Sequence, residues 1–463
     1  MTLTERIARL CVETMPGRIG ARELANARLC LIDGLAVAMA ASRSSQITLL
    51  RETLEIGGAS GSASLLGHRL RAKPDDAALI NGMMVSLLLF DDNHSTMRGH
   101  PTGPVLPAVL ALSQRLGASL ETALRAFIIG YEMECRLGPV FNPSQYEVGW
   151  HATATQGTFG AAASACVLLG LDVEQTCRAF GIAASLLGGV RRNFGTMTMS
   201  FHSGIAASSG VRAAMLAQGG FTADPHIFDG DRCIGELLSR EWKPAQLEAQ
   251  LPLWGAPFEI FDSGPLFKLF PVGRPLVAPI EAALEIRAMP GFDARLVTEI
   301  TAEVSYMYPR TVVHNAPTTG LQGKTSLHYN LAAALLFGRP KIATYSDEAV
   351  VDPSIVPLRD KVRLVVPPHL TDQVEAVRIL PFDQPVTIIV TQSNGLVMRS
   401  VVQFPRGMPQ NPVGEVDLME KFSDCVAEGF DPALTSNLKS LLDTPGVSVD
   451  AVVELLAGAA RAS

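Results

Sequence analysis

One short stretch of the sequence concentrates groups that could transfer protons. The run from Phe90 to Pro101 holds two carboxylates, two histidines and an arginine. His100 can take or give a proton near neutral pH, and Asp91 or Asp92 could orient it or stabilise its charged form. The two carboxylates follow an apolar helical pattern, and the C-terminus of a helix disfavours negative charge by a few tenths to about 1 kcal/mol. This local cost favours a catalytic site, and a solvated loop with Asp residues capping the next turn is the alternative.

A second candidate acid or base is His151, in the run Gly149-Trp150-His151. It precedes a helical pattern that we expect to begin near Thr155. The positive end of the helix dipole opposes protonation of a histidine just outside the N-terminus, so His151 should be neutral and able to accept a proton. A structural histidine stacked on Trp150 is the alternative.

A third candidate group is polar and small. The run from Asn193 to Gly204 contains Thr198 and His202 and follows two arginines. Its hydroxyls and loop amides, ahead of a helix expected from Ile205, could cradle an anion, and an arginine could clamp a carboxylate. Thr and Ser before a helix also serve as N-caps, which is the alternative for this run.

Three residues of the second half of the chain complete the candidates. Lys268 and Arg274 flank a proline-punctuated crossing between predicted domains, where clefts commonly form. Tyr329 lies at the head of an Ala-rich helical pattern, where a tyrosine is more often packing than a substrate contact.

The elements that must position these residues are helical for about the first 250 residues. Apolar side chains recur with helical spacing, and almost no segment alternates with a period of two. Several helices are rich in Ala, Gly and Ser, which lets helix backbones approach closely. The expected helices cover about residues 3–11, 22–41, 74–90, 105–116, 120–137, 155–169, 173–187 and 205–218.

Strands are predicted only after a stretch crowded with proline and glycine, between about Leu251 and Pro279. Residues 296–306 and 362–366 read as strands, and 386–392 with 396–404 flank an Asn-Gly turn typical of a hairpin. Two further helices are expected at about 417–428 and 450–460. The predicted fold is therefore α+β with two domains: a large all-helical domain begins with residues 1–262, a smaller α+β domain with an antiparallel sheet covers 263–405, and helices in 406–463 return to the helical domain.

Composition limits the class of protein further. A net charge of −7 argues against nucleic-acid binding. A charged fraction of only 18% suggests that part of the surface contacts a partner subunit. We see no apolar run near the 18 residues of a membrane span and no signal peptide. The seven cysteines are scattered and form no CxxC pair, which favours reduced thiols over a zinc site or disulfides. A cytoplasmic protein without a metal is expected, and the loop motifs of nucleotide-binding proteins and of serine and zinc hydrolases are missing from the sequence.

Taken together, these stretches resemble the MmgE/PrpD family over nearly the whole chain. The likeness is carried by Phe90-Asp91-Asp92 with His100-Pro101, by Gly149-Trp150-His151, by the run 193–204, by Phe270-Pro271 and by Ser326 to Tyr329. Residues 97–101 and 149–151 are most similar to the epimerase branch. The resemblance implies a helical domain with a smaller α+β domain, a homodimer, a small di- or tricarboxylate substrate, and catalysis without metal or organic cofactor in the decarboxylase and epimerase members.

Two positions depart from the family pattern. Met199 stands where lysine usually follows Gly-Thr-Met-Thr, and Val277 stands where we align a family histidine. Both family residues are counted in the active sites of decarboxylases and dehydratases. Loss of one general acid or base alone typically costs 10²–10⁴-fold in rate, so a dehydratase or decarboxylase activity does not follow from membership alone.

The family chemistry is a carbanion or enediolate next to a carboxylate, which assigns a role to each candidate. His100 is base or acid with Asp91 or Asp92, and His151 is the second acid/base. Thr198, His202 and Tyr329 are predicted contacts to substrate oxygens, and Arg98, Lys268 and Arg274 are predicted anchors for its carboxylates. Met199 is a predicted substrate-binding position that makes the pocket more apolar. We predict a lyase of the dehydratase type, with an epimerase or decarboxylase as the alternative and a non-catalytic binder as the third reading.

Overall fold

The computed structural model describes residues 1–58, 60–262, 264–371 and 384–459, and these form two compact units. The first unit contains residues 1–87, 91–266 and 413–463, and the second contains 88–90 and 267–412. The sequence predicted boundaries at 262/263 and 405/406, and residue 263 lies outside the described residues, as does Ala460 at the end of the last predicted helix.

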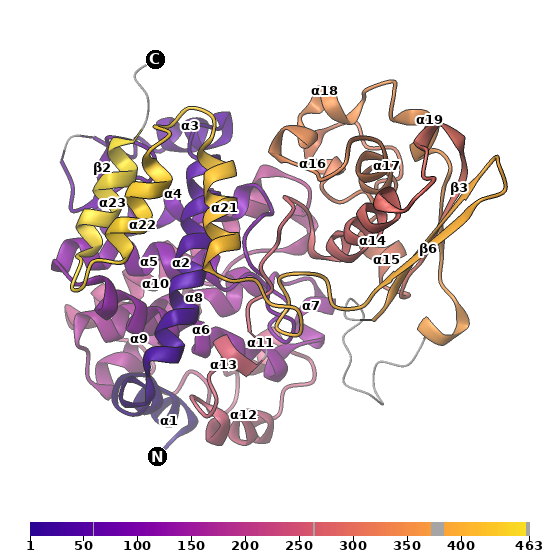
Figure 1. Ribbon diagram of the computed structural model, residues 1–463. Helices are drawn as coiled ribbons and strands as arrows, with labels where there is room; N and C mark the ends of the chain where they lie inside the picture. Colours follow the sequence, from indigo (N-terminus) through magenta and orange to yellow (C-terminus); the bar gives the residue numbers. More distant parts are fainter. Residues whose placement is uncertain (59, 263, 372–383, 460–463) are drawn as a thin grey trace. The chain divides into compact units, whose positions relative to one another are not determined.

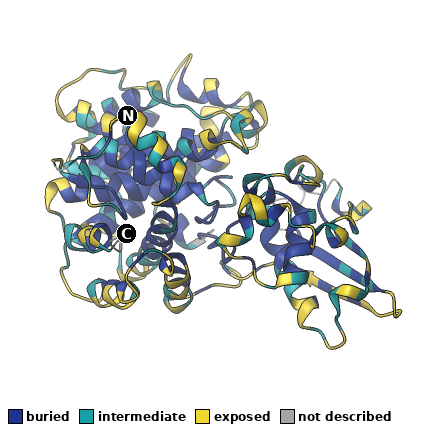
Figure 2. Ribbon diagram, turned by 90° about the horizontal axis from the view of Figure 1, so that it is seen from above, coloured by how far each residue is buried: buried dark blue, intermediate teal, exposed yellow. Residues whose placement is uncertain are grey.

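The first unit is a bundle of helices (Figure 1). Helices α4, α5, α6, α8 and α10 pack against one another and are mostly buried, as Figure 2 shows for the inner helices of this unit. The longer helices of the N-terminal part are α1 (Leu3–Arg9), α2 (Ala21–Ala41), α3 (Ser45–Thr53), α4 (Pro74–Leu87), α5 (Thr102–Leu116), α6 (Leu120–Phe141), α8 (Ala152–Leu169), α9 (Val173–Ser185) and α10 (Met197–Gln218). Shorter helices are α7 (Ser144–Val148), α11 (Ile234–Leu238), α12 (Pro244–Gln250) and α13 (Glu259–Asp262), and strands β1 (Ala63–Ser64) and β2 (Arg71–Ala72) form a two-stranded sheet.

Glycines allow α4 and α10 to touch backbone to backbone. A Cβ atom added at Gly204 would lie 2.2 Å from the carbonyl oxygen of Leu79, and one added at Gly82 would lie 2.8 Å from Cα of Gly204. The close approach expected from the small residues of these helices is therefore confirmed.

Helix α10 begins earlier than the sequence analysis predicted. Thr196 has the extended backbone of an N-cap, and helical geometry starts at Met197 rather than Ile205. No proline interrupts residues 197–204, and Gly204 is accommodated inside the helix because α4 packs against it. The run 198–204 is thus helical, and the predicted helix start at Ile205 was wrong. Binding of an anion by the amides ahead of this helix stays a prediction. Helix α8 likewise begins at Ala152, with His151 as its N-cap residue.

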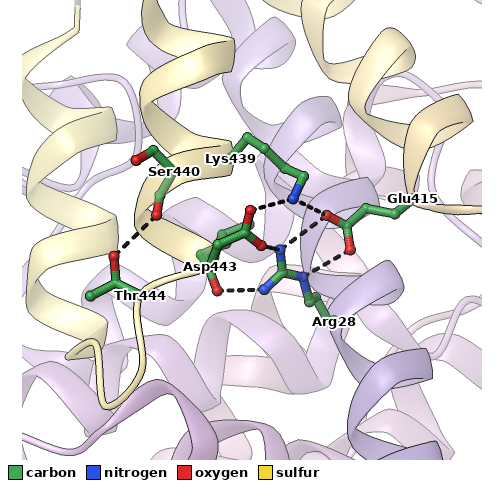
Figure 3. A network of polar contacts seen from close by, with 7 residues as sticks. Arg28, Glu415, Lys439, Ser440, Asp443 and Thr444 are labelled. Atoms are coloured by element: carbon green, nitrogen blue, oxygen red, sulfur yellow. Dashed lines mark hydrogen bonds and ion pairs between the residues drawn. The ribbon is translucent and has the colours of Figure 1, made fainter.

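The C-terminal helices α21 (Glu415–Val426), α22 (Leu434–Leu442) and α23 (Val449–Gly458) belong to the first unit, and α21 packs along α2. Figure 3 shows Arg28 of α2 bound to Glu415, with a nitrogen–oxygen distance of 3.0 Å, and to Asp443 after α22. Lys439 lies 3.2 Å from the same Glu415 carboxylate. These ion pairs join the two ends of the chain on the surface of the unit.

Helix α2 is long and apolar enough to cross a membrane by length and composition alone, which the sequence analysis did not expect. Two-thirds of its most apolar window is buried inside the unit, and its Asp33 pairs with Lys421 of α21 at 2.6 Å. A buried helix in the core of a bundle can have this length and composition without crossing a membrane.

The second unit is built on a four-stranded mixed sheet in the order β4-β3-β5-β6 (Figure 1). Strands β5 (Val386–Gln392) and β6 (Val397–Val402) form the hairpin predicted around the Asn-Gly turn, where Gly395 has a positive φ of 85°. Strand β3 (Val297–Glu303) pairs antiparallel with β5, but β4 (Val362–Val365) joins it in parallel, so the sheet is not purely antiparallel.

Two longer helices pack in this unit: α14 (Val277–Ala288) lies against β5 and β6, and α17 (Leu327–Phe337) lies against α14. Their apolar residues share one core with the inward side chains of β3 and β5, and Val277 is part of that core. Short helices complete the unit: α15 (Tyr308–Thr311), α16 (Gly320–Gly323), α18 (Asp347–Val350) and α19 (Val356–Arg359).

Candidate functional site

The centre of the candidate site is a histidine–carboxylate pair in the first unit. Nδ1 of His100 lies 3.1 Å from Oδ2 of Asp91, whose carboxylate also accepts a hydrogen bond from the Ser86 hydroxyl at the end of α4. Asp91 is fully buried, whereas about a fifth of the His100 side chain is exposed. A carboxylate beside Nδ1 orients the ring and leaves Nε2 to exchange a proton, which is the arrangement of a general base.

The orientation of the Asn93 amide indicates which His100 nitrogen is free to act. Its Nδ2 donates to the carbonyl of Gly99 and lies 3.3 Å from Nε2 of His100. In this orientation the amide nitrogen can only donate, which favours an Nε2 without a hydrogen. That tautomer places the hydrogen of a neutral ring on Nδ1, on the side of Asp91, and leaves the lone pair on Nε2 available as a base.

The loop that carries His100 is held in place from both sides. The His100 backbone N–H donates to the hydroxyl of Thr153 in the first turn of α8 at 3.0 Å. Nε2 of His94, earlier in the loop, lies 3.2 Å from Glu259, which in turn pairs with Arg136 of α6 at 2.8 Å. These contacts fix the loop against two helices, as a preorganised site requires.

Two further histidines meet close to this pair. Nδ1 of His151 lies 3.0 Å from Nδ1 of His202, and both side chains are buried. His151 is the N-cap residue of α8, and its ring also packs edge-on against Phe194, with centroids 4.9 Å apart. The His151 ring thus contacts Phe194 and His202, rather than Trp150 as the alternative interpretation expected.

The electrostatic surroundings keep these two histidines neutral. Burial lowers the pKa of His151 well below its usual range, and His202, His100 and Arg191 lower it further, whereas Asp91 opposes them. Burial also lowers the pKa of His202. The neutral state expected for His151 from its place at a helix N-terminus agrees with this direction, but burial rather than the dipole is the main cause.

Asp92 has different partners from Asp91. Its carboxylate accepts hydrogen bonds from the backbone and hydroxyl of Thr102, at 3.2 and 2.9 Å, where α5 begins. Burial raises the pKa of Asp92 well above its usual range, and Asp33 and Asp91 add to the effect. Asp92 thus makes contacts like those of the capping alternative, whereas Asp91 does not, and both side chains are buried rather than solvated. A catalytic role of Asp92 stays a prediction.

The other predicted residues of the first unit lie on α10 or in the loop. Thr198 is exposed in the first turn of α10, and Met199 beside it is buried. Arg98 has a left-handed backbone, with φ of 55°, between His94 and His100. Their predicted contacts with a substrate stay predictions.

Four of the residues singled out from the sequence lie in the second unit. The Lys268 ammonium is buried and donates to the carbonyl of Leu89 at 2.7 Å, and the Tyr329 hydroxyl donates to the carbonyl of Thr344. Burial raises the pKa of Tyr329 to about 12. Arg274 begins the turn that leads into α14, and Val277 follows it in the apolar core.

Sequence reasoning missed four polar residues of potential importance. Asn93, Thr153 and Ser86 contact the His100–Asp91 pair, and Asn93 stood within the quoted motif without being assigned a role. In the second unit the buried Lys324 donates to the carbonyl of Leu88 at 2.9 Å, and burial, with Lys268 nearby, lowers its pKa to about 7. No composition or spacing signal distinguished Lys324 from a surface lysine.

The described residues contain no group of three or more His, Cys, Asp or Glu side chains arranged to hold a metal ion. All seven cysteines are buried free thiols. The structure instead contains two pairs of groups that can exchange protons: His100 with Asp91, and His151 with His202.

Comparison with known proteins identifies two successive family domains in the chain, in agreement with its two units. Residues 5–247 match the MmgE/PrpD N-terminal domain and residues 270–442 match the MmgE/PrpD C-terminal domain. The chain is similar to cis-aconitate decarboxylase of Homo sapiens, with 25% identity over 91% of this chain and 87% of that protein. It is also similar to a cis-aconitate decarboxylase-like protein of Aspergillus oryzae, with 24% identity over 98% and 96% of the two chains, and to 2-methylcitrate dehydratase of Cupriavidus necator, with 26% identity over 88% and 86%. With both domain models matched in order along a two-unit chain of mostly helical structure, this protein belongs to the MmgE/PrpD family.

Proposed function

We propose that this protein is a lyase that acts on a small carboxylate substrate through a carbanion or enediolate next to the carboxylate. The observation that carries the proposal is the His100–Asp91 pair, with an Nε2 lone pair on His100, beside the buried His151–His202 couple. The relatives named above are a decarboxylase and a dehydratase, which favours bond cleavage over epimerisation.

His100 acts as the base in this mechanism. Its Nε2 removes the proton from the carbon next to the substrate carboxylate, and the electron pair of the C–H bond passes into that carboxylate as an enediolate. The imidazolium that forms is stabilised by Asp91 at 3.1 Å. The Asn93 amide must turn from Nε2 when the substrate enters, because the two compete for the same lone pair.

The His151–His202 couple supplies the acid. In a dehydration one ring donates its Nε2 hydrogen to the leaving hydroxyl as the enediolate collapses, a proton from solvent enters at the other ring, and water departs. In a decarboxylation carbon dioxide leaves first, and the same couple protonates the carbanion. We propose the dehydration as the first of the two, with Arg98 as an anchor for a substrate carboxylate and with Thr198 and His202 as contacts to its other oxygens. The roles of Lys268, Arg274 and Tyr329 stay predictions from the sequence.

The test is proton NMR in D₂O with purified protein and a panel of hydroxy-tricarboxylates, unsaturated tricarboxylates and amino-dicarboxylates. New vinyl signals or loss of carbon dioxide, reduced about 10²–10⁴-fold in His100→Gln, would support the lyase. His226→Gln is the matched control, because His226 also lies near an aspartate, at 3.7 Å from Asp224, but on an exposed surface.

The other outcomes of this experiment are equally definite. Deuterium exchange at the carbon next to the carboxylate without loss of water or carbon dioxide would replace the lyase by an epimerase. No change across the panel, with binding detected by calorimetry, would instead identify a non-catalytic binder.

A further inference from the structure

The two buried histidines of the site share a single hydrogen. Their Nδ1 atoms are 3.0 Å apart, and both side chains are at least nine-tenths buried. Two N–H groups facing each other at this distance would bring their hydrogens into collision, and two bare nitrogens would repel through their lone pairs. One ring must therefore donate through Nδ1 and the other must accept.

This contact determines the state of the opposite side of each ring. A neutral imidazole carries one hydrogen, so the ring that donates through Nδ1 has a bare Nε2, and the ring that accepts has an Nε2–H. Among the described residues no side chain forms a hydrogen bond with Nε2 of either ring. The couple thus presents one base and one acid, and the identity of each is reversed when the shared hydrogen moves.

We propose that His151 and His202 form a proton-transfer couple in which a proton taken up at Nε2 of one ring is released from Nε2 of the other. Uptake makes the first ring an imidazolium, its Nδ1 hydrogen passes to Nδ1 of the second ring, and the second ring gives up its Nε2 hydrogen. One proton enters and one leaves, the couple stays neutral overall, and the two tautomers have exchanged.

The surroundings of the couple favour this neutral exchange. His100 and Asp91 from the loop and Arg191 from the turn before α10 are the charged or titratable groups that act on His151 besides His202. The positive neighbours and burial disfavour a lasting imidazolium, so a proton that arrives on one ring is passed on rather than kept. The helices also hold the rings still, because His151 is the N-cap residue of α8 and His202 lies two residues from the α4 contact at Gly204.

The inference deepens the proposed function, because it makes His202 a positioning and relay residue for His151 in the acid step. His202 lies on α10 three residues beyond Met199, the position where the family usually has lysine.

The first test needs no substrate. Long-range proton–nitrogen NMR on the full chain with ¹⁵N-labelled histidine reports the tautomer of each of the nine histidines. Single variants His151→Gln and His202→Gln assign the two signals. Near neutral pH we expect the two rings to have opposite tautomers, one Nδ1–H and one Nε2–H, and both to be neutral. Identical tautomers, or a charged ring at neutral pH, would overturn the proposal.

The second test measures the relay in turnover. With a substrate found in the panel, we measure the wild-type rate in mixtures of H₂O and D₂O. A plot of this rate against deuterium content should be curved, because two protons move in the acid step. In His202→Gln we expect a rate lower by about tenfold or more, a linear dependence and a shifted pH profile. A linear dependence in the wild type, or a His202→Gln variant that is slower by the same factor at every pH and keeps the curvature, would contradict the relay. If no substrate is turned over, the proposed function fails while the NMR result still decides the couple.

Discussion

At the scale of single residues, Asp91 and Asp92 are neighbours in sequence with different surroundings. Asp91 contacts His100 at 3.1 Å, whereas Asp92 binds Thr102 at the start of α5. We expect Asp91→Asn to lower turnover by about 10²-fold or more, because the imidazolium of His100 loses its counter-charge. Asp92→Asn should lower turnover by less than Asp91→Asn, because Thr102 rather than His100 contacts its carboxylate. Steady-state rates of the two variants decide, and equal losses would contradict the assignment.

A second residue-scale prediction concerns Glu134 of α6, which lies outside the proposed chemistry. It is fully buried, and neither carboxylate oxygen has a hydrogen-bond partner among the described residues. Burial raises its pKa well above the usual value of 4.5, with Asp92 adding to the effect. The folded state therefore holds this proton more tightly than the unfolded state, and Glu134 makes the protein less stable as the pH rises above about 4.5.

We expect Glu134→Gln to remove this dependence. Near pH 4 both proteins carry a neutral side chain and should have similar stability. Above that pH the variant should gain relative to the wild type, by up to about 1.4 kcal/mol for each pH unit until the folded-state pKa is reached. Urea unfolding between pH 4 and 8 measures the difference. If the free energies of unfolding of the two proteins change with pH in parallel, Glu134 is not the cause of this pH dependence.

The sequence indicated a contact between His100 and a nearby aspartate, and it named His151 and His202 as site residues without predicting their contact. His100 and Asp91 are nine residues apart, and a single loop brings them together, so their pattern was visible locally. His151 and His202 are 51 residues apart on two helices, and their contact depends on how α8 and α10 pack. The buried state of Lys324 depends likewise on tertiary packing that no local pattern records.

At the scale of elements, the contact between α4 and α10 depends on a missing side chain. We expect Gly204→Ala to destabilise the protein by about 1–3 kcal/mol, because its Cβ would lie 2.2 Å from the carbonyl oxygen of Leu79. Gly458→Ala in α23 is the control, since nothing lies within 4 Å of the added atom and alanine favours a helix. Thermal unfolding of both variants provides the measurement, and a similar effect in both would contradict the close-contact explanation.

Most elements followed from local patterns, and the exceptions have tertiary causes. The Asn-Gly hairpin of β5 and β6 was predicted because its turn chemistry is local. The parallel pairing of β4 with β3 was missed because it depends on a crossover of about sixty residues. The early start of α10 was missed because Gly204 reads as a helix breaker, whereas here α4 occupies the space that a side chain would fill.

At the scale of the whole molecule, the buried pair of Asp33 and Lys421 joins α2 to α21 across the sequence. We expect Lys421→Met to cost about 3–5 kcal/mol, because it leaves a carboxylate charge in the core. The double variant Asp33→Leu with Lys421→Met should recover most of the loss, since neither charge remains. Urea unfolding of the three proteins provides the comparison, and a double variant no more stable than Lys421→Met would contradict this account.

The assembly of the molecule also stays a prediction. A charged fraction of 18% and the resemblance to the family led us to expect a homodimer. Light scattering of the purified protein at several concentrations should give twice the chain mass of 49.3 kDa, and a single-chain mass throughout would contradict the expectation.

The ion pair of Asp33 and Lys421 has a consequence for synthesis of the chain on the ribosome. Lys421 follows Asp33 by 388 residues, so at about 5–20 residues per second it is made on the order of 20–80 seconds later. Throughout that interval the nascent helical unit lacks both the counter-charge and the α21 surface that covers α2. The residues of the second unit are made within the same interval. The helical unit is therefore completed last although it is begun first, and until then its exposed apolar helices are the part of the nascent chain most in need of chaperone protection.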